Sequence, residues 1–295
     1  MADPNHIRFQ LFGLEAADPL PVAALTRAAD LASKPDTGRY WLRADPVTMW
    51  ADMARVYMSQ CGFADLDPYE RNEIEACVRG VLAEAGIELQ DGHPERWCIA
   101  LTEAPGFDFV PLPRALGKDL GETLPQHPEA QFWRRLLGEI QVALHHCPVN
   151  ARRREQGRLE INSLWFWGGG FLPPQGGESH IDAVYSDDPV SSGLAIINDC
   201  PLQALRRVGK VDFSGDGRSV LIDWTPSSGD AHAELNALEG FLAALLPVLH
   251  RGGRELTLID GSGAVREYAR ARRFCFWRRR RPLAQCLPTP LTLSK

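Results

Sequence analysis

Three long segments repeat apolar residues at spacings of three and four, the pattern of a helix with one buried face. The first carries its own boundary signals: Asp67 is a natural N-cap, Pro68 fits the first helical position and Gly86 fits the stop. The others run over residues 128–146 and 229–250. The expected buried faces are Ile74, Cys77, Val78, Val81, Leu82 and Ala85; Phe132, Leu136, Ile140 and Leu144; and Leu235, Leu238, Leu242, Leu245 and Leu249.

Shorter runs of apolar, β-branched and aromatic residues predict strands. The run at 161–167 carries apolar residues on both faces, with Trp165 and Trp167 on one side and Leu164 and Phe166 on the other. Such a strand is typical of the inside of a parallel sheet. The predicted strands cover residues 7–13, 39–50, 54–58, 87–90, 96–102, 161–167, 219–224 and 254–261, and PVAALTRAADLA near residue 21 predicts one more helix.

The last third of the chain follows the order strand, helix, strand, which predicts a right-handed crossover onto a parallel sheet. We therefore predict an α/β fold with a mostly parallel central sheet flanked by helices. The 295 residues are assigned to a single α/β domain, 1–295, with a smaller α/β lobe inserted at about 40–115.

The stretch INSLWFWGGG, residues 161–170, ends in three consecutive glycines. One interpretation is a buried strand that ends in a tight turn. The other is a strand that brings backbone close to a ligand, with glycines that leave room for it. The candidate ligand-loop residues are Asn162, Gly168, Gly169 and Gly170.

The formal net charge of -6 conceals an asymmetry, because residues 266–281 hold eight arginines and one glutamate. This basic strip, within a C-terminal segment 266–295, could bind nucleic acid, or it could be a strand whose aromatic residues pack inward. The acidity of the rest of the chain argues against nucleic-acid binding. The strip residues are Arg270, Arg272, Arg273, Arg278, Arg279, Arg280 and Arg281.

The cysteines and histidines indicate neither a metal site nor a disulfide framework. Seven cysteines lie far apart without a C-x-x-C pair, which predicts a reduced, cytoplasmic chain. The eight histidines are scattered, and VDFSGDGRSVLID fits a hairpin better than a calcium loop. We expect no metal and no cofactor. There is no signal-peptide pattern, and the longest apolar stretch, FLAALLPVL, is shorter than the ~20 residues of a membrane span.

The segment HHCPVNARRREQGRLEINSLWFWGGG, residues 145–170, resembles the archaeal-type cofactor-independent phosphoglycerate mutases, with a Pro-Val-Asn-x-x-Arg turn followed by a Trp-x-Trp-Gly strand. The RpfE-type family of proteobacterial proteins resembles a longer part of the chain, which is most of residues 39–170. The resemblance implies an alkaline-phosphatase-like α/β fold of reduced size. The anion-binding candidates lie in this segment and are Asn150, Arg152, Arg153 and Arg154.

Active mutases of that superfamily hold two divalent metals with Asp and His and carry phosphate on Ser or Thr. Their first strand ends in Asp-Gly, whereas residues 7–13 run into Leu14 and Glu15; a late strand ends in Asp-His, whereas Asp260 is followed by Gly261. No G-x-S-x-G nucleophile motif occurs either. No catalytic residue is therefore assigned.

The sequence thus predicts a non-catalytic relative of phosphoglycerate mutase that acts as a regulatory or binding protein. The alternative is a metal-dependent phosphoglycerate mutase or phosphatase-like enzyme, and a second alternative is nucleic-acid binding through the basic strip. The expected partner is a phosphorylated small molecule or another protein, with no membrane interaction.

Overall fold

The computed structural model describes residues 4–15, 19–52, 55–61, 65–119, 127–174, 181–205, 218–225, 231–252, 255–260 and 264–268. Its first half contains α1 (Pro4–Leu11), α2 (Val22–Leu31), β1 (Tyr40–Asp52), β2 (Arg55–Cys61), α3 (Pro68–Glu84), β3 (Glu88–His93), β4 (Arg96–Leu101) and α4 (Leu112–Ala115). Its second half contains α6 (Ala130–His145), α7 (Pro148–Glu155), β5 (Ser163–Phe171), β6 (Ala183–Ser186), α8 (Pro189–Ile197), β7 (Leu202–Gln203), β8 (Val220–Asp223), α9 (Ala231–Gly252), β9 (Leu256–Ile259) and β10 (Val265–Tyr268).

The larger sheet has five strands and is built around β1. One edge of β1 pairs with β5 over residues 40–47, and the other pairs first with β4 and then with β2. Every described pairing in this sheet is antiparallel, including that of β3 with β4. The prediction of a mostly parallel central sheet is therefore wrong for this sheet.

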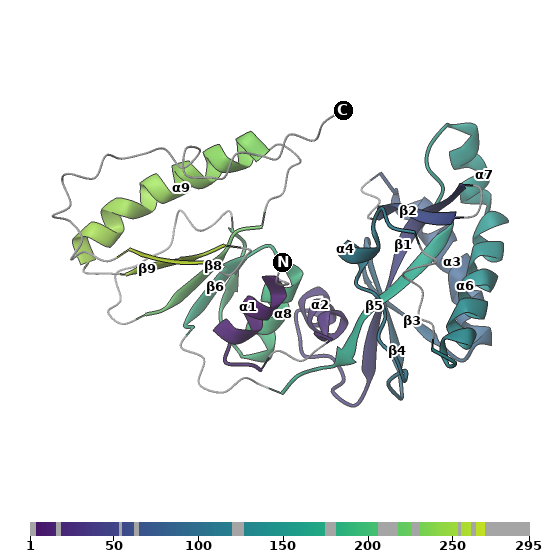
Figure 1. Cartoon of the computed structure of the whole chain (residues 1–295), viewed down its shortest axis with the longest axis horizontal. Coiled ribbons are helices and arrows are strands. Elements are labelled where there is room, and N and C mark those ends of the chain that lie inside the picture. Colours follow the sequence, from purple (N-terminus) through teal and green to yellow (C-terminus); the bar gives the residue numbers. More distant parts are fainter. Residues whose placement is uncertain are drawn as a thin grey trace.

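Helices cover both faces of the five-stranded sheet, as Figure 1 shows. On one face α3 and α6 pack against alternate residues of β1, such as Leu42 and Ala44, and against Phe166 of β5. On the opposite face α2 and α8 pack with Trp41 of β1 and Cys98 of β4. The alternation of strand side chains thus separates two hydrophobic clusters. Both faces of β5 are buried, as its sequence predicts.

Helix α3 forms where its local signals predict. The Asp67 carboxylate accepts hydrogen bonds from the backbone N–H of Tyr69 at 2.8 Å and of Glu70 at 2.9 Å. Gly86 has φ +74°, the left-handed conformation that ends helices. The predicted apolar face is confirmed by its fully buried members, Ile74, Val78 and Leu82.

One predicted strand and one residue of a predicted buried helix face are wrong. Residues 7–13 do not form a strand, because residues 7–11 belong to α1 and residues 12 and 13 to the turn after it. Phe9 and Phe12 are three residues apart and both buried, which is a helical spacing. In α6, Phe132 is exposed and the adjacent Trp133 enters the core instead.

A three-stranded parallel sheet, in the order β7-β6-β8, lies beside α8 and α1. The predicted strand at 219–224 and the following helix are confirmed as β8 and α9, whose Leu245 and Leu249 are buried. In the described pairings β9 joins β10 in an antiparallel pair, so the predicted crossover onto β8's sheet is wrong. The division into an inserted lobe at 40–115 stays a prediction; β5 lies outside that range and pairs with β1.

Candidate functional site

The parallel sheet gathers hydroxyl and carboxylate side chains at one edge. Strand β6 ends at Ser186 and β8 ends at Asp223, and the two strands run in the same direction. Asp188 follows β6 and is the N-cap of α8, where its Oδ1 accepts hydrogen bonds from the backbone N–H of Val190 and Ser191. The carboxyl ends of parallel strands are where ligands of open α/β folds bind.

Asp223 is the centre of this cluster. Its Oδ2 accepts a hydrogen bond from the Ser191 hydroxyl at 2.5 Å and lies 3.4 Å from the Ser186 hydroxyl. Both serines are buried, and Ser191 has no exposed surface. The hydroxyl groups therefore hold the Asp223 carboxylate in a fixed orientation away from bulk water.

Arg8, on α1, joins the two carboxylates of the cluster. Its Nε lies 3.0 Å from Asp223 Oδ2, and one terminal nitrogen lies 3.2 Å from Asp188 Oδ2. All three side chains are largely buried, with 13–16% of their surface exposed. The guanidinium is a planar donor with one positive charge, so it offsets part of the negative charge of the two carboxylates. The sequence carries no local signal for this cluster, because Arg8 and Asp223 are 215 positions apart and the segment around Arg8 resembles a strand.

The cluster does not fit the pair of divalent metals that Asp and His hold in active mutases. Its two carboxylates are bound by a cationic side chain of the chain itself, and its other polar groups are hydroxyls and the Asn5 amide, whose oxygen accepts a hydrogen bond from Arg8. Within the residues that the structure describes, no three His, Cys, Asp or Glu side chains are grouped to hold a metal ion.

The three consecutive glycines belong to β5 and lie against the start of α2. Gly168 has φ +65°, and an added Cβ there would meet the Val22 side chain. A Cβ on Gly170 would lie 2.5 Å from Pro21 Cβ, and one on Gly169 would overlap the Tyr40 ring. Glycine at these positions lets a helix and a neighbouring ring approach the strand closely. Their role in a ligand loop stays a prediction.

Asn162 and Asn150 have their amides bonded to backbone groups. Asn162 accepts from the Met49 N–H at 2.7 Å and donates to the Met49 carbonyl at 2.6 Å, which fixes the start of β5 against β1. Asn150 donates to the carbonyls of Leu144 and Ile161 and accepts from the Ile161 N–H. Asn150 has no exposed surface, so these bonds connect α6, α7 and the segment that leads into β5 inside the core.

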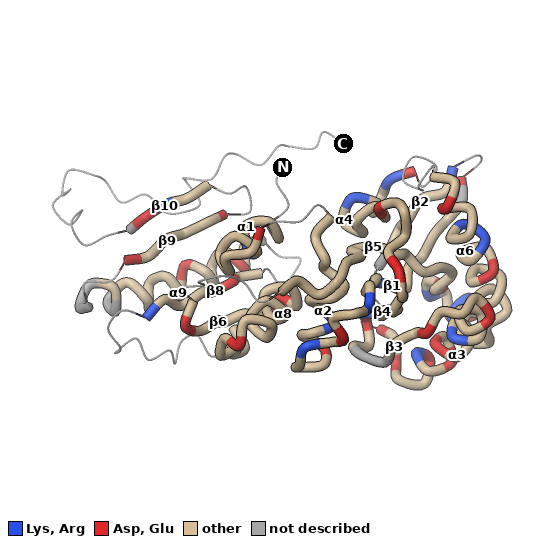
Figure 2. Tube along the Cα trace, turned by 90° about the horizontal axis from the view of Figure 1, so that it is seen from below, with Lys and Arg blue, Asp and Glu red and all other residues tan. Residues whose placement is uncertain are grey.

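The three arginines of α7 each bind a carboxylate of the chain. Arg152 pairs with Glu73, and Arg154 with Glu160 at 2.6 Å. Arg153 is 1% exposed and pairs with Glu70 and Asp65, both at 3.0 Å. Figure 2 shows basic and acidic positions close together in the region of α3. An external anion would compete with these pairs, and anion binding by the α7 arginines stays a prediction.

These ion pairs change the pKa values of the acidic side chains in this region. The hydrogen bond from Arg152 lowers the pKa of Glu73. Partial burial raises the pKa of Asp65, but the hydrogen bonds from Arg158 and Arg153 outweigh it, so the net pKa is lowered. Arg158 also contacts both Glu70 and Asp65, so α3 and α7 are joined by a network of charges.

A second polar group lies between α2 and the sheet. Arg43 donates to Asp45 Oδ1 at 3.0 Å through Nε, and the Trp167 indole N–H donates to Asp45 Oδ2 at 2.7 Å. Burial raises the pKa of Asp45, whereas the Arg43 charge and the hydrogen bonds lower it. The effect of burial is the larger, so the net pKa is raised. The group holds Trp167 beneath the Arg43 guanidinium, which lies 5.5 Å from its ring centroid.

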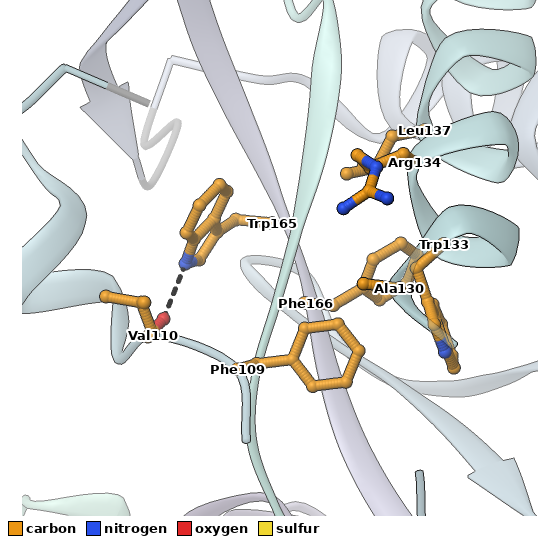
Figure 3. Close-up of a pocket in the computed structure, with 8 residues that line it drawn as sticks. All are labelled: Phe109, Val110, Ala130, Trp133, Arg134, Leu137, Trp165 and Phe166. Carbon is orange, nitrogen blue, oxygen red and sulfur yellow. Dashed lines mark hydrogen bonds between the residues drawn. The ribbon is translucent and has the colours of Figure 1, made fainter. Parts of the chain in front are cut away.

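The described surface has two hollows of note. Trp165 and Phe166 leave β5 on opposite sides, and the cavity beside Phe109 and Trp133 has about 10 Å³, room for about one water molecule (Figure 3). A more open hollow of about 250 Å³ lies near Arg39 and Glu103. The smaller cavity is a packing gap between aromatic rings.

Several predicted features lie outside the described residues. These are the basic strip from Arg270 to Arg281, the SGDG turn, and Gly261 after β9. None of the helices that the structure describes combines the length and apolarity that a membrane crossing demands.

No protein-family model matches the chain. Over 132 residues, 44% of the chain, it is 24% identical to a probable 2,3-bisphosphoglycerate-independent phosphoglycerate mutase of Geobacter sulfurreducens, 33% of which is covered. Over 57 residues, 19% of the chain, it is 40% identical to the 2,3-bisphosphoglycerate-independent phosphoglycerate mutase of Methanosarcina barkeri, 14% of which is covered. The matched segments thus span at most 33% of these curated relatives.

The PH0037 protein of Pyrococcus horikoshii has a similar solved structure, with a TM-score of 0.50 and 13% identity. The similarity covers 84% of this chain and 63% of that chain, and at this identity it concerns the fold alone. The sequence comparisons show that the chain is related to the cofactor-independent phosphoglycerate mutases over part of its length, and its own helices and strands form an α/β fold.

Proposed function

We propose that this chain is a non-catalytic relative of the cofactor-independent phosphoglycerate mutases that acts as a binding or regulatory protein of the RpfE type. The observation that carries the proposal is the position of Arg8 between Asp188 and Asp223 at the carboxyl edge of the parallel sheet. A cation that entered between these carboxylates would have to displace the guanidinium and break both ion pairs.

The hydroxyl groups of the cluster support the same proposal. A serine that carries phosphate has to reach its substrate, whereas Ser191 is completely buried and Ser186 is 4% exposed. Both hydroxyls are directed at the Asp223 carboxylate. The edge is therefore organised as an internal network of hydrogen bonds and ion pairs.

The enzyme alternative has one observation in its favour. A serine hydroxyl 2.5 Å from a carboxylate, as in Ser191 and Asp223, is a pairing that can activate an oxygen nucleophile once a substrate gains access. The curated relatives named above are described as phosphoglycerate mutases. A phosphomutase or phosphatase-like activity is therefore the reading that the experiment has to separate from binding.

The test measures conversion of 2-phosphoglycerate to 3-phosphoglycerate by the purified full chain, with and without added Mn²⁺. We expect no turnover above the blank in either condition. Thermal shift with 3-phosphoglycerate and other phosphorylated metabolites then tests binding, and a rise in melting temperature without turnover is the expected result. Turnover that disappears on chelation would contradict the proposal.

A variant isolates the role of Arg8. Arg8→Met removes the guanidinium, so Mn²⁺ should raise the melting temperature of the variant but not of the wild type. Lys34→Met is the control, because Lys34 pairs with Asp199 at 2.9 Å in a more exposed position. An equal Mn²⁺ response of wild type and both variants would show that Arg8 does not exclude cations.

A further inference from the structure

Two cysteines that are distant in the sequence meet between α3 and the junction of α6 with α7. Cys77 lies on α3, and Cys147 is the residue directly before α7. Their sulfur atoms are 3.0 Å apart although 70 positions separate them in the chain. Both are free thiols in the structure. The sulfurs need to approach by about 1 Å more to reach the length of a disulfide bond.

We propose that Cys77 and Cys147 are a site of reversible oxidation, at which a two-electron oxidant such as a peroxide or a diazene closes an intramolecular disulfide. The sequence spacing of the cysteines gave no indication of this pair, since no C-x-x-C motif occurs. The pair exists only because α3 packs beside the end of α6.

The exposure of the two sulfurs sets the order of the reaction. Cys77 is half-buried, whereas Cys147 is 1% exposed, so an oxidant reaches Cys77 first. With a diazene, the Cys77 sulfur adds to one nitrogen and a proton goes to the other. The Cys147 thiol then attacks the Cys77 sulfur; the sulfur–sulfur bond forms, the sulfur–nitrogen bond breaks, and the reduced hydrazine leaves with two electrons and two protons.

The surroundings make the first step slow. Burial is the largest cause, and the hydrogen bond with Cys147 the second, of a pKa of Cys77 that is raised to about 12. Little thiolate is present at neutral pH, and the thiolate is the reactive form. The oxidation should therefore take place over minutes to hours. The disulfide, once formed, should also be reduced slowly, because it is buried and a reductant reaches it with difficulty.

The disulfide would add a covalent bond to the contact between α3 and α7. Cys147 directly precedes α7, and Glu73, one turn before Cys77, pairs with Arg152. The bond would close a long loop, which restricts the unfolded chain and stabilises the fold. We expect oxidation to raise the melting temperature by roughly 5–15 °C.

The experiment treats the reduced full-length protein with diamide and maps its disulfides by tryptic digestion and mass spectrometry without reduction. The expected product joins peptide 72–79, which contains Cys77, to peptide 136–152, which contains Cys147. The linked pair should be lighter than the two separate peptides by two hydrogen atoms. Addition of dithiothreitol should restore the separate peptides and the original melting temperature.

Two variants and a control complete the test. Cys77→Ser and Cys147→Ser should each abolish the linked peptide and the thermal shift, and Cys77→Ser serves alone if the buried Cys147→Ser does not fold. Cys200→Ser is the matched control, because Cys200 is also half-buried but its sulfur contacts the backbone oxygen of Ile181 at 3.3 Å. Absence of the linked peptide after oxidation, or a thermal shift on oxidation that persists in Cys77→Ser, overturns the proposal.

Discussion

Replacing the glycines of β5 with alanine one at a time tests why three glycines follow each other in this strand. Gly168 has a positive φ, which costs an alanine about 1–2 kcal/mol. Gly170 has ordinary backbone geometry, but an added Cβ would lie 2.8 Å from Pro21 Cα. Because this neighbour is backbone at the start of α2, it cannot rotate away. The helix would have to shift.

The structure therefore predicts that Gly170→Ala destabilises the protein more than Gly168→Ala does. Overpacking of a well-packed contact costs about 1–3 kcal/mol and sometimes more. Gly138, in α6, is the matched control because an added Cβ there meets nothing within 4 Å. Gly138→Ala should instead raise the unfolding free energy by about 0.5–1 kcal/mol, since alanine is the better helix former.

Urea unfolding followed by tryptophan fluorescence measures these effects, with the midpoint and slope compared across the variants. The expected order of stability is Gly138→Ala, wild type, Gly168→Ala and then Gly170→Ala. A Gly170→Ala protein as stable as the wild type would show that the strand and α2 are not in close contact. Loss of stability in Gly138→Ala as large as in Gly170→Ala would show that the effect is not specific to β5.

Two further changes test the core and the charge network. Trp165→Ala should lower the unfolding free energy by about 3–5 kcal/mol, because the ring is 3% exposed and its N–H donates to the Val110 carbonyl; an unchanged urea midpoint would refute its burial. The pKa values of Glu73 and Asp65 are lowered from their ordinary values of 4.5 and 3.8. Their ion pairs therefore stabilise the fold at pH values above these ordinary values, and this stabilisation is lost as the pH falls through the lowered pKa values. Glu73→Gln should therefore weaken the dependence of urea stability on pH between about 5 and 2, and a dependence identical to the wild type's would contradict this.

Elements whose signals lie within a few residues could be predicted from the sequence. Asp67, Pro68 and Gly86 marked both ends of α3 because capping acts on neighbouring backbone groups. The alternation in residues 163–167 placed Trp165 and Phe166 on opposite faces of β5 because a strand has a period of two.

Short segments with two compatible periods could not be decided in this way. Ile7, Phe9 and Leu11 alternate like a strand, but Phe9 and Phe12 also fit one face of a helix. Packing against α8 and the residues around it selected the helix. In α6 the adjacent Phe132 and Trp133 are equally apolar, and only the position of β5 decided that Trp133 is buried.

Only the tertiary structure decided which distant residues meet. The antiparallel pairing of β5 with β1, the approach of Cys77 to Cys147, and the contact of Arg8 with Asp223 over 215 positions leave no local pattern. A strand's apolar alternation fixes its buried faces but not the direction or identity of its neighbour. That choice depends on how all the helices and strands bury their surfaces together, so the glycines of β5 could be identified as a close approach only once Pro21 and Tyr40 were seen beside them.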